Sequence, residues 1–306
     1  MGPSLLAVPV RLEAFAKVNL SLRVLGRRPD GFHELDTLFQ TIDFSDELVF
    51  TEGEKFEFVC SEPGIPSGPE NLVFKAGRFL AETAGVPLRG RVELTKRIPA
   101  GGGLGGGSAD AAAALLGLSA LWDLRPTAAD LGPIAARLGS YVPFFLVGGT
   151  ARGTGRGEIV SPLPDGPSEW LVLLLPPWPV STSDVYGELG ASELAELTGT
   201  TAASNLRGSG PDSFPDQNDL EEAAERLRGE LAVLRYALRA AGATRARLSG
   251  SGSTLFGAFP DASAAAAAAR RLEEENPGVR AVRVRTLDRS GFRKRACPDT
   301  MRQAGR

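Results

Sequence analysis

The sequence is poor in the two residue types that build disulfide frameworks and zinc sites. Among its 306 residues it has two cysteines, Cys60 and Cys297, and one histidine, His33. Two cysteines this far apart in the chain suit a reducing compartment. A Cys/His zinc site needs four ligands, and these two residue types supply only three. We therefore expect a cytoplasmic protein without a structural zinc.

Long apolar runs and an excess of positive charge are also missing. The longest apolar run, about residues 170–180, is too short to span a bilayer and is interrupted by three prolines. The first residues lack the basic and apolar pattern of a signal peptide. The net charge is −3, so no overall positive field would collect nucleic acid or an anionic membrane. We expect a small-molecule partner, no nucleic acid and no membrane, and the sequence leaves the oligomeric state open.

Residues 13–24 have the alternation that is typical of a β-strand with one buried face. Every second position is apolar, namely Ala14, Ala16, Val18, Leu20, Leu22 and Val24. The opposite face presents Lys17, Asn19 and Ser21 in a row. The sequence thus predicts a strand that displays a row of polar groups.

The most unusual segment follows a strand-like stretch that ends at Ile98. Residues 111–124, which come after it, are rich in Ala and Leu and predict a buried helix. The order is therefore strand, glycine loop, helix. The loop consists of Pro99, Ala100, Gly101, Gly102, Gly103, Leu104, Gly105, Gly106, Gly107, Ser108, Ala109 and Asp110.

A glycine loop in this position predicts nucleotide binding. Glycines let the backbone approach an anion closely, so that successive N–H groups and the positive end of the next helix can face phosphate oxygens. Ser108 fits either as a helix cap or as a hydroxyl ligand to a phosphate-bound Mg²⁺. Asp110 would repel phosphate unless a metal intervenes. A flexible linker is the alternative, but linkers rarely join a strand to an apolar helix.

Two common glycine motifs do not account for this loop. Gly101, Gly103 and Gly106 satisfy the dinucleotide-binding spacing, but the acidic residue expected about 20 positions later should end a second strand. The candidate, Asp123, instead lies at the end of the predicted helix. Walker A is absent as well, because no Gly-Lys-Ser/Thr closes the loop.

The C-terminal half predicts a mixed αββαβ order. Asn218 caps an acidic turn, and leucines recur at helical spacing from Leu220 to a helix end near Gly242. The later elements are a strand at 245–248, a small-residue loop at 249–254, a strand to 259, a helix at about 262–275 and a strand at 282–286.

Composition changes suggest how the chain divides. Residues 161–169 are rich in Pro, Ser and Gly and mark the best candidate domain boundary, and residues 199–217 predict a surface loop. We expect one domain over residues 1–165 and a second over residues 166–288. Residues 289–306 are basic without apolar periodicity, which predicts a flexible tail.

Six blocks, in order along the chain, resemble one family. They are residues 16–20, residues 30–34 with 37–40, the glycine segment 99–110, and residues 153–158, 218–221 and 249–252. The glycine loop alone is similar to GHMP kinases in general. The Asp30–Glu34 block is more particular and resembles the 4-diphosphocytidyl-2-C-methyl-D-erythritol kinase family.

This resemblance implies an α+β fold with two domains. The N-terminal, ATP-binding domain would have the topology of ribosomal protein S5, and the C-terminal domain would be ferredoxin-like, with the active site in the cleft between them. The implied reaction is ATP-dependent phosphorylation of the 2-hydroxyl of 4-diphosphocytidyl-2-C-methyl-D-erythritol, in the non-mevalonate (MEP) isoprenoid pathway. ATP and Mg²⁺ would lie on residues 99–110, with Ser108 toward the metal.

The resemblance also implies roles for single residues. Lys17 corresponds to the family's catalytic lysine; Phe32 and Tyr186 correspond to the aromatic pair that sandwiches cytosine, and His33 to the residue at the edge of the base. The alternatives are a solvated lysine, packing aromatics and a structural turn histidine. Further substrate contacts are implied for Asn19, Ser249, Gly250, Ser251 and Gly252.

One position departs from the family pattern. The family's motif places a catalytic aspartate where this chain has Tyr141, within residues 139–143. A phenol with a pKa near 10 is about 0.1% ionised at pH 7 and makes a poor base. Four explanations are open. The enzyme could rely on positioning and charge neutralisation without a base, or Lys17 could lower the pKa of Tyr141 enough for the phenol to act. The chain could instead bind ATP and substrate without turnover, or Tyr141 could be a sequence variant. Another GHMP kinase, acting on homoserine or mevalonate, is the remaining alternative.

Overall fold

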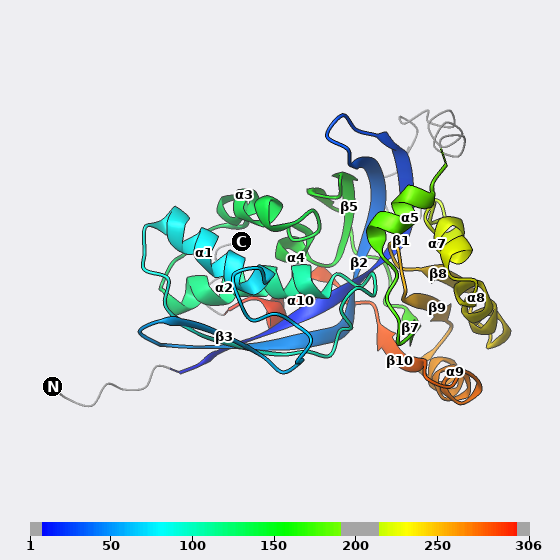
Figure 1. The fold of residues 1–306 in the computed structure, drawn as a ribbon. Coiled ribbons are helices and arrows are strands. Elements are labelled where there is room, and N and C mark those ends of the chain that lie inside the picture. Colours follow the sequence, from blue (N-terminus) through cyan, green and yellow to red (C-terminus); the bar gives the residue numbers. More distant parts are fainter. Residues whose placement is uncertain (1–7, 191–213, 299–306) are drawn as a thin grey trace.

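Two β-sheets organise the chain, one in each lobe of the molecule (Figure 1). The structure is a computed structural model, and it describes residues 8–190 and 214–298. None of the helices in these two ranges is long and apolar enough to cross a membrane. Residues 199–213 of the loop predicted at 199–217 lie outside the described residues.

The first sheet has six strands, in the order β3-β4-β2-β5-β6, with β1 paired to β2. Its strands are β1 (Val10–Arg27), β2 (His33–Thr51), β3 (Phe56–Cys60), β4 (Gly90–Thr95), β5 (Thr150–Gly155) and β6 (Ile159–Pro162). Four helices accompany it: α1 (Leu72–Ala84), α2 (Gly106–Leu121), α3 (Ala128–Leu138) and α4 (Phe144–Val147). Helix α2 is Ala- and Gly-rich, which lets it lie close to the sheet. A Cβ on Gly117 would lie 2.2 Å from the Phe50 ring.

The second sheet has four strands in the order β10-β7-β9-β8. Its strands are β7 (Trp170–Leu175), β8 (Arg245–Leu248), β9 (Leu255–Phe259) and β10 (Arg280–Arg285), and the helices of this lobe are α5 (Thr182–Glu188), α7 (Glu221–Leu227), α8 (Glu230–Ala240) and α9 (Ala262–Glu275). Strand β7 has apolar residues at every position because both of its faces are buried. The predicted αββαβ order and the helix at 262–275 are confirmed.

The long β1–β2 hairpin belongs to both lobes. Its residues Leu12 and Phe50 lie in the core of the first lobe, whereas Leu22, Val24 and Leu35 lie in the core of the second. Figure 1 shows the hairpin, in blue, running from the first lobe to the side of the second. The prediction of one buried face is wrong here, because Lys17, Asn19 and Ser21 are buried as well. Lys17 is covered by the glycine loop, where it donates to Gly103 O, and by the ring of Tyr141, and Gly250 of the second lobe lies next to Lys17 and Asn19.

Two further expectations are corrected. The predicted helix from Leu220 to Gly242 is two helices, α7 and α8, because the chain turns at Arg228 and Gly229. Residues 289–296 are not a flexible tail but helix α10 (Arg289–Ala296), whose Phe292 is buried against Phe15. The boundary predicted at residue 165 falls between β6 and β7 and stays a prediction.

Candidate active site

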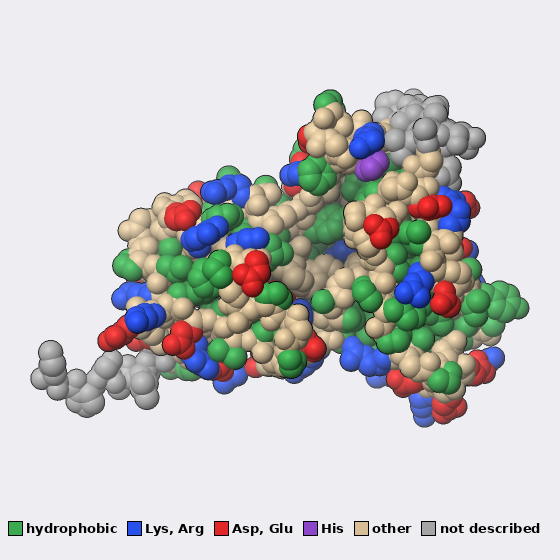
Figure 2. All heavy atoms as spheres, in the orientation of Figure 1, with side chains coloured by type: hydrophobic (Ala, Val, Ile, Leu, Met, Phe, Trp, Pro, Cys, Tyr) green, Lys and Arg blue, Asp and Glu red, His purple; other side chains and the backbone are tan. Residues whose placement is uncertain are grey.

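Two cavities lie at the two ends of the glycine loop. The larger, the acceptor cavity, has a volume of about 1000 Å³ and is lined by Ser108, Tyr141, Phe32, His33 and Tyr186 among others. The smaller, about 550 Å³, is lined by Pro99 and Ala100 at the start of the loop, together with residues of both lobes. Figure 2 shows the surface hollowed between the two lobes, with a histidine side chain at the rim. The loop therefore separates two spaces that can each hold a small molecule.

The glycine loop takes a conformation that a Cβ would forbid. Gly101, Gly103 and Gly105 have positive φ angles of 71°, 75° and 73°. A Cβ on Gly103 would lie 2.1 Å from the carbonyl oxygen of Ser249. Helix α2 begins at Gly106, so the free N–H groups of its first turn belong to the loop itself. Ser108 is thus inside the first turn and does not cap the helix.

The second small-residue loop, residues 249–254, is joined to the glycine loop by hydrogen bonds. Thr254 N donates to Gly102 O (3.1 Å), and Ser249 Oγ donates to Gly103 O (3.0 Å). Ser251 Oγ lies 2.8 Å from Thr182 Oγ1, at the start of α5. Predicted substrate-binding residues of the second loop are therefore in contact with the glycine loop and with Thr182, which lines the acceptor cavity.

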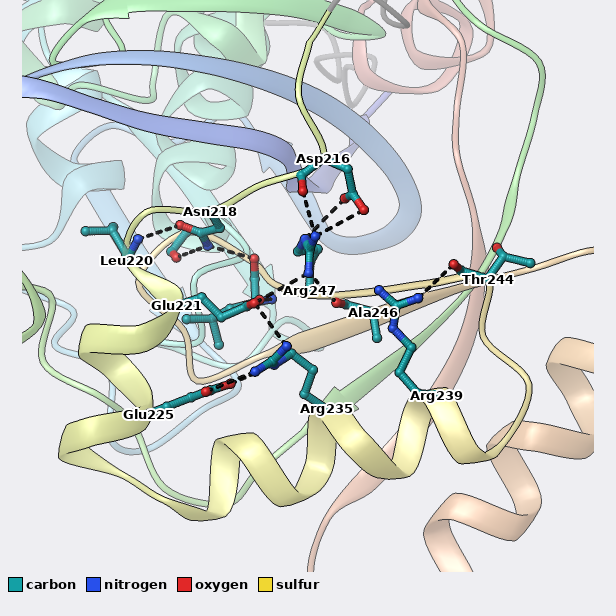
Figure 3. A network of polar contacts seen from close by, with 12 residues as sticks. Asp216, Asn218, Leu220, Glu221, Glu225, Arg235, Arg239, Thr244, Ala246 and Arg247 are labelled. Atoms are coloured by element: carbon teal, nitrogen blue, oxygen red, sulfur yellow. Dashed lines mark hydrogen bonds and ion pairs between the residues drawn. The ribbon is translucent and has the colours of Figure 1, made fainter. Parts of the chain in front are cut away.

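A polar network holds this second loop in place (Figure 3). Asn218 Nδ2 donates to the carbonyl oxygens of Leu248 (2.9 Å) and Gly250 (2.8 Å). Leu248 N donates to Glu221 Oε2 (2.8 Å), and Arg247 and Arg235 lie on the other side of that carboxylate. The block 218–221 thus fixes the loop.

Lys17 lies beneath the glycine loop and is buried. Its Nζ donates to Asn19 Oδ1 and to Gly103 O, both at 2.5 Å, and Asn19 Nδ2 donates to Thr37 Oγ1 (2.7 Å). Lys17 forms no ion pair with any residue in the described ranges. Burial without a counter-ion lowers the pKa of Lys17 to about 7. The prediction that Lys17 and Asn19 share one face of the strand is confirmed, and the structure adds that this face adjoins the glycine loop.

Tyr141 lies in the turn between α3 and α4, next to Lys17. The Lys17 Nζ is 5.4 Å from the centre of the Tyr141 ring, which also packs edge-on against Phe39 at 5.6 Å between ring centres. Burial raises the pKa of Tyr141. Burial thus acts against the alternative in which Lys17 lowers the pKa of Tyr141, and it favours the protonated phenol at neutral pH.

The three residues expected at the base-binding end all line the acceptor cavity, but their arrangement differs from the expected sandwich. Tyr186 stacks on His33, with ring centres 4.7 Å apart and an interplanar angle of 20°. Phe32 is exposed, and the guanidinium of Arg156 instead lies over its ring, 4.5 Å from the ring centre. Burial lowers the pKa of His33, helped by Arg27, so its neutral ring offers one donor and one acceptor.

A buried ion cluster at the start of the glycine loop was not predicted. Lys96 pairs with Asp110 (2.8 Å) and with Asp46. Asp46 Oδ1 also accepts hydrogen bonds from the backbone N–H groups of Arg97 (2.5 Å) and Ile98 (2.9 Å). Lys96 thus pairs with Asp110 in the first turn of α2. The sequence offered one signal, since Lys96 is among only five lysines in the chain.

The fold and the loop define a class of small-molecule kinase. Residues 71–149 match the model of the GHMP kinases N terminal domain, and residues 197–278 match that of the GHMP kinases C terminal. A solved homoserine kinase from Cytophaga hutchinsonii, 20% identical with a TM-score of 0.65, covers 92% of this chain and 95% of its own and shares the fold.

More similar relatives define the family within this class. A 4-diphosphocytidyl-2-C-methyl-D-erythritol kinase of Moorella thermoacetica is 43% identical over 275 residues, 87% of this chain and 95% of that protein. A relative of the same name from Solibacter usitatus is 41% identical over 86% of this chain and 85% of its own. A crystal structure of a 4-(cytidine 5'-diphospho)-2C-methyl-D-erythritol kinase, 36% identical, superposes with a TM-score of 0.72 over 90% of this chain and 99% of its own. The chain belongs to the 4-diphosphocytidyl-2-C-methyl-D-erythritol kinase family.

Proposed function

We propose that this chain transfers the γ-phosphoryl group of ATP to the 2-hydroxyl of 4-diphosphocytidyl-2-C-methyl-D-erythritol, in the non-mevalonate isoprenoid pathway. The observation that carries the proposal is the placement of Lys17 under a glycine loop that has a cavity at each end. One cavity has aromatic and histidine side chains suited to a pyrimidine, and the family membership agrees with that substrate. A cytoplasmic location is part of the proposal, because Cys60 and Cys297 are both free thiols.

ATP is placed with its nucleoside in the smaller cavity and its phosphates along the loop. Pro99 and Ala100 line that cavity, and the N–H groups that follow, from Gly101 to the first turn of α2, lead toward Ser108 on the other side. Such N–H groups and the helix dipole stabilise phosphate oxygens. Lys17 Nζ, at Gly103 O, supplies the positive charge at the point of transfer.

The residues present fit a Mg²⁺ ion that is held mainly by the phosphates. The described residues contain no cluster of three or more His, Cys, Asp or Glu side chains that could hold a metal. The Ser108 hydroxyl lines the acceptor cavity and is the group that would complete the coordination, whereas the Asp110 carboxylate is buried against Lys96. Bound there, Mg²⁺ would neutralise the charge that develops on the transferring group.

The acceptor is placed with cytosine at Phe32, His33 and Tyr186 and its alcohol near Lys17 and Tyr141. Phosphoryl transfer passes through a loose transition state, so positioning and charge neutralisation supply most of the rate. Lys17 and the loop N–H groups provide both without a carboxylate base. The substrate hydroxyl would then lose its proton late, as the bond to phosphorus forms, and the proton would pass to solvent or phosphate.

The test is ADP release, coupled to a spectroscopic readout, with 4-diphosphocytidyl-2-C-methyl-D-erythritol, ATP and Mg²⁺. Turnover that cytidine inhibits competitively, with no turnover of homoserine or mevalonate, is the expected result. Lys17→Ala should lower kcat by at least 100-fold, and the exposed Lys294→Ala is the matched control. ATP binding without ADP formation would identify a binding protein. Turnover of another alcohol would reassign the substrate.

A further inference from the structure

The charged side chains that line the acceptor cavity have one sign. Among the described residues that line it, the charged ones are Arg27 and Arg156. Arg27 ends β1 and Arg156 follows β5, and both strands pair with β2, so the first sheet supplies both arginines to this cavity. A cavity with this lining favours an anion.

Arg156 lies between the two ends of the cavity. Its guanidinium is 4.5 Å from the ring centre of Phe32, at the base-binding end. The next residue, Gly157, lies against Tyr141 at the transfer end. A Cβ on Gly157 would lie 2.8 Å from Tyr141 Cε1. The turn that carries Arg156 therefore spans the distance from the base to the reacting alcohol.

The donors of Arg156 are available to a ligand. Its side chain forms no hydrogen bond within residues 8–190 and 214–298, and the nearest carboxylate oxygen, on Glu158, is 3.8 Å from Nε. The neighbouring acids Asp30 and Glu34 are paired with Arg28 instead, at 3.2 Å and 2.5 Å. Phe32 shields one face of the guanidinium and leaves its edge, with the N–H donors, for an anion.

We propose that Arg156, together with Arg27 of the same cavity, binds the diphosphate that links the base to the alcohol of the acceptor. This inference rests on the proposed function, because only a nucleoside diphosphate-linked acceptor carries an anion between those two ends. A guanidinium fits two phosphate oxygens at once, which a lysine cannot do. Arg156 thereby selects acceptors with a diphosphate over those with a bare nucleoside.

The experiment measures dissociation constants of cytidine, CMP and CDP for the full chain and for Arg156→Gln, at one ionic strength. CDP should bind the parent at least 10-fold more tightly than cytidine, as expected for charge-assisted hydrogen bonds. Arg156→Gln should lose most of that preference while its affinity for cytidine stays within about twofold. Arg156→Lys should keep part of it. Arg271→Gln, a surface arginine on α9, is the matched control.

Steady-state kinetics add a second readout. Arg156→Gln should raise KM for the acceptor by about 10-fold or more and leave kcat and KM for ATP within about twofold. Equal affinities for cytidine and CDP in the parent would overturn the inference while leaving the proposed function standing. An equal loss of cytidine and CDP in the variant would also overturn it, since Arg156 would then act through Phe32. Failure of every cytidine compound to bind would instead overturn the proposed function.

Discussion

Replacing Tyr141 with aspartate should increase the rate of this enzyme. At pH 7 an ordinary phenol is about 0.1% ionised, and burial raises the pKa of Tyr141 further. An aspartate with an ordinary pKa would be almost fully ionised at that pH, and Lys17, whose Nζ lies 5.4 Å from the centre of the present ring, would keep it so. The substitution therefore introduces a base where none exists.

The size of the gain follows from what a positioned base contributes. General-base catalysis is worth about 10²–10⁴-fold in rate. We expect the lower end, about 100-fold in kcat, because the Tyr141 ring also packs against Phe39 and Gly157 and its loss loosens the turn. The new carboxylate would also raise the pKa of Lys17, which keeps its ammonium charged above pH 7.

The assay is coupled ADP release with the parent and three variants. Tyr141→Asn opens the same space without an ionisable group and should give less than a tenth of the gain. Tyr141→Phe keeps the ring and should match the parent within about twofold. If Tyr141→Phe lost activity, the phenol would have a chemical role and the reasoning would be wrong. If Tyr141→Asp and Tyr141→Asn were equally active, relief of crowding rather than a base would explain the gain.

Three other outcomes follow from the structure. Burial lowers the pKa of Lys17 to about 7, so kcat/KM for ATP should be highest below pH 7, where the ammonium is charged, and should fall as the pH rises through 7. A pH profile that is flat from 6 to 9 would contradict this. Lys96→Met leaves two buried carboxylates unpaired and should lower the free energy of unfolding by about 3 kcal/mol in urea, with the loss shrinking at acid pH as they protonate; unchanged stability would argue against the cluster. Phe292→Ala should lower the free energy of unfolding by about 3 kcal/mol, whereas the exposed Lys294→Ala should leave it almost unchanged. Equal stability of the two variants would show that the docking of α10 does not stabilise the fold.

Features encoded by local patterns could be predicted from the sequence. The glycine loop, the alanine-rich helix after it and the strand before it are adjacent in the chain, so composition and periodicity alone placed them in the right order. The same holds for the helix at 262–275 and the strands on either side of it. Helix α2 nevertheless begins at Gly106, earlier than expected, at a position where a Cβ would lie 2.9 Å from Ile98 Cγ2.

Features that depend on distant parts of the chain could not be predicted. Lys17, in the polar row of β1, is buried because Gly103 of the glycine loop, 86 residues later, and Gly250 of the second lobe lie over it. Lys96 and Asp46 are 50 residues apart, and no periodic pattern links them. Helix α10 has only two buried residues, Phe292 and Ala296, and its neighbours are charged, so the sequence resembles a tail. Its docking depends on Phe15 at the other end of the chain.

The same contacts that stabilise the fold also orient the phosphate-binding groups. The glycine loop is fixed at its start by Asp46, beneath its centre by Lys17, and from the other lobe by Ser249 and Thr254. Donors fixed in this way do not have to reorganise when charge develops on the transferring group, which is the main source of electrostatic catalysis. Tyr141 makes no hydrogen bond to this framework in the described part of the chain and adds only packing. The proposed transfer therefore depends on this framework more than on Tyr141, and the position of Tyr141 is where we expect substitution to raise the rate.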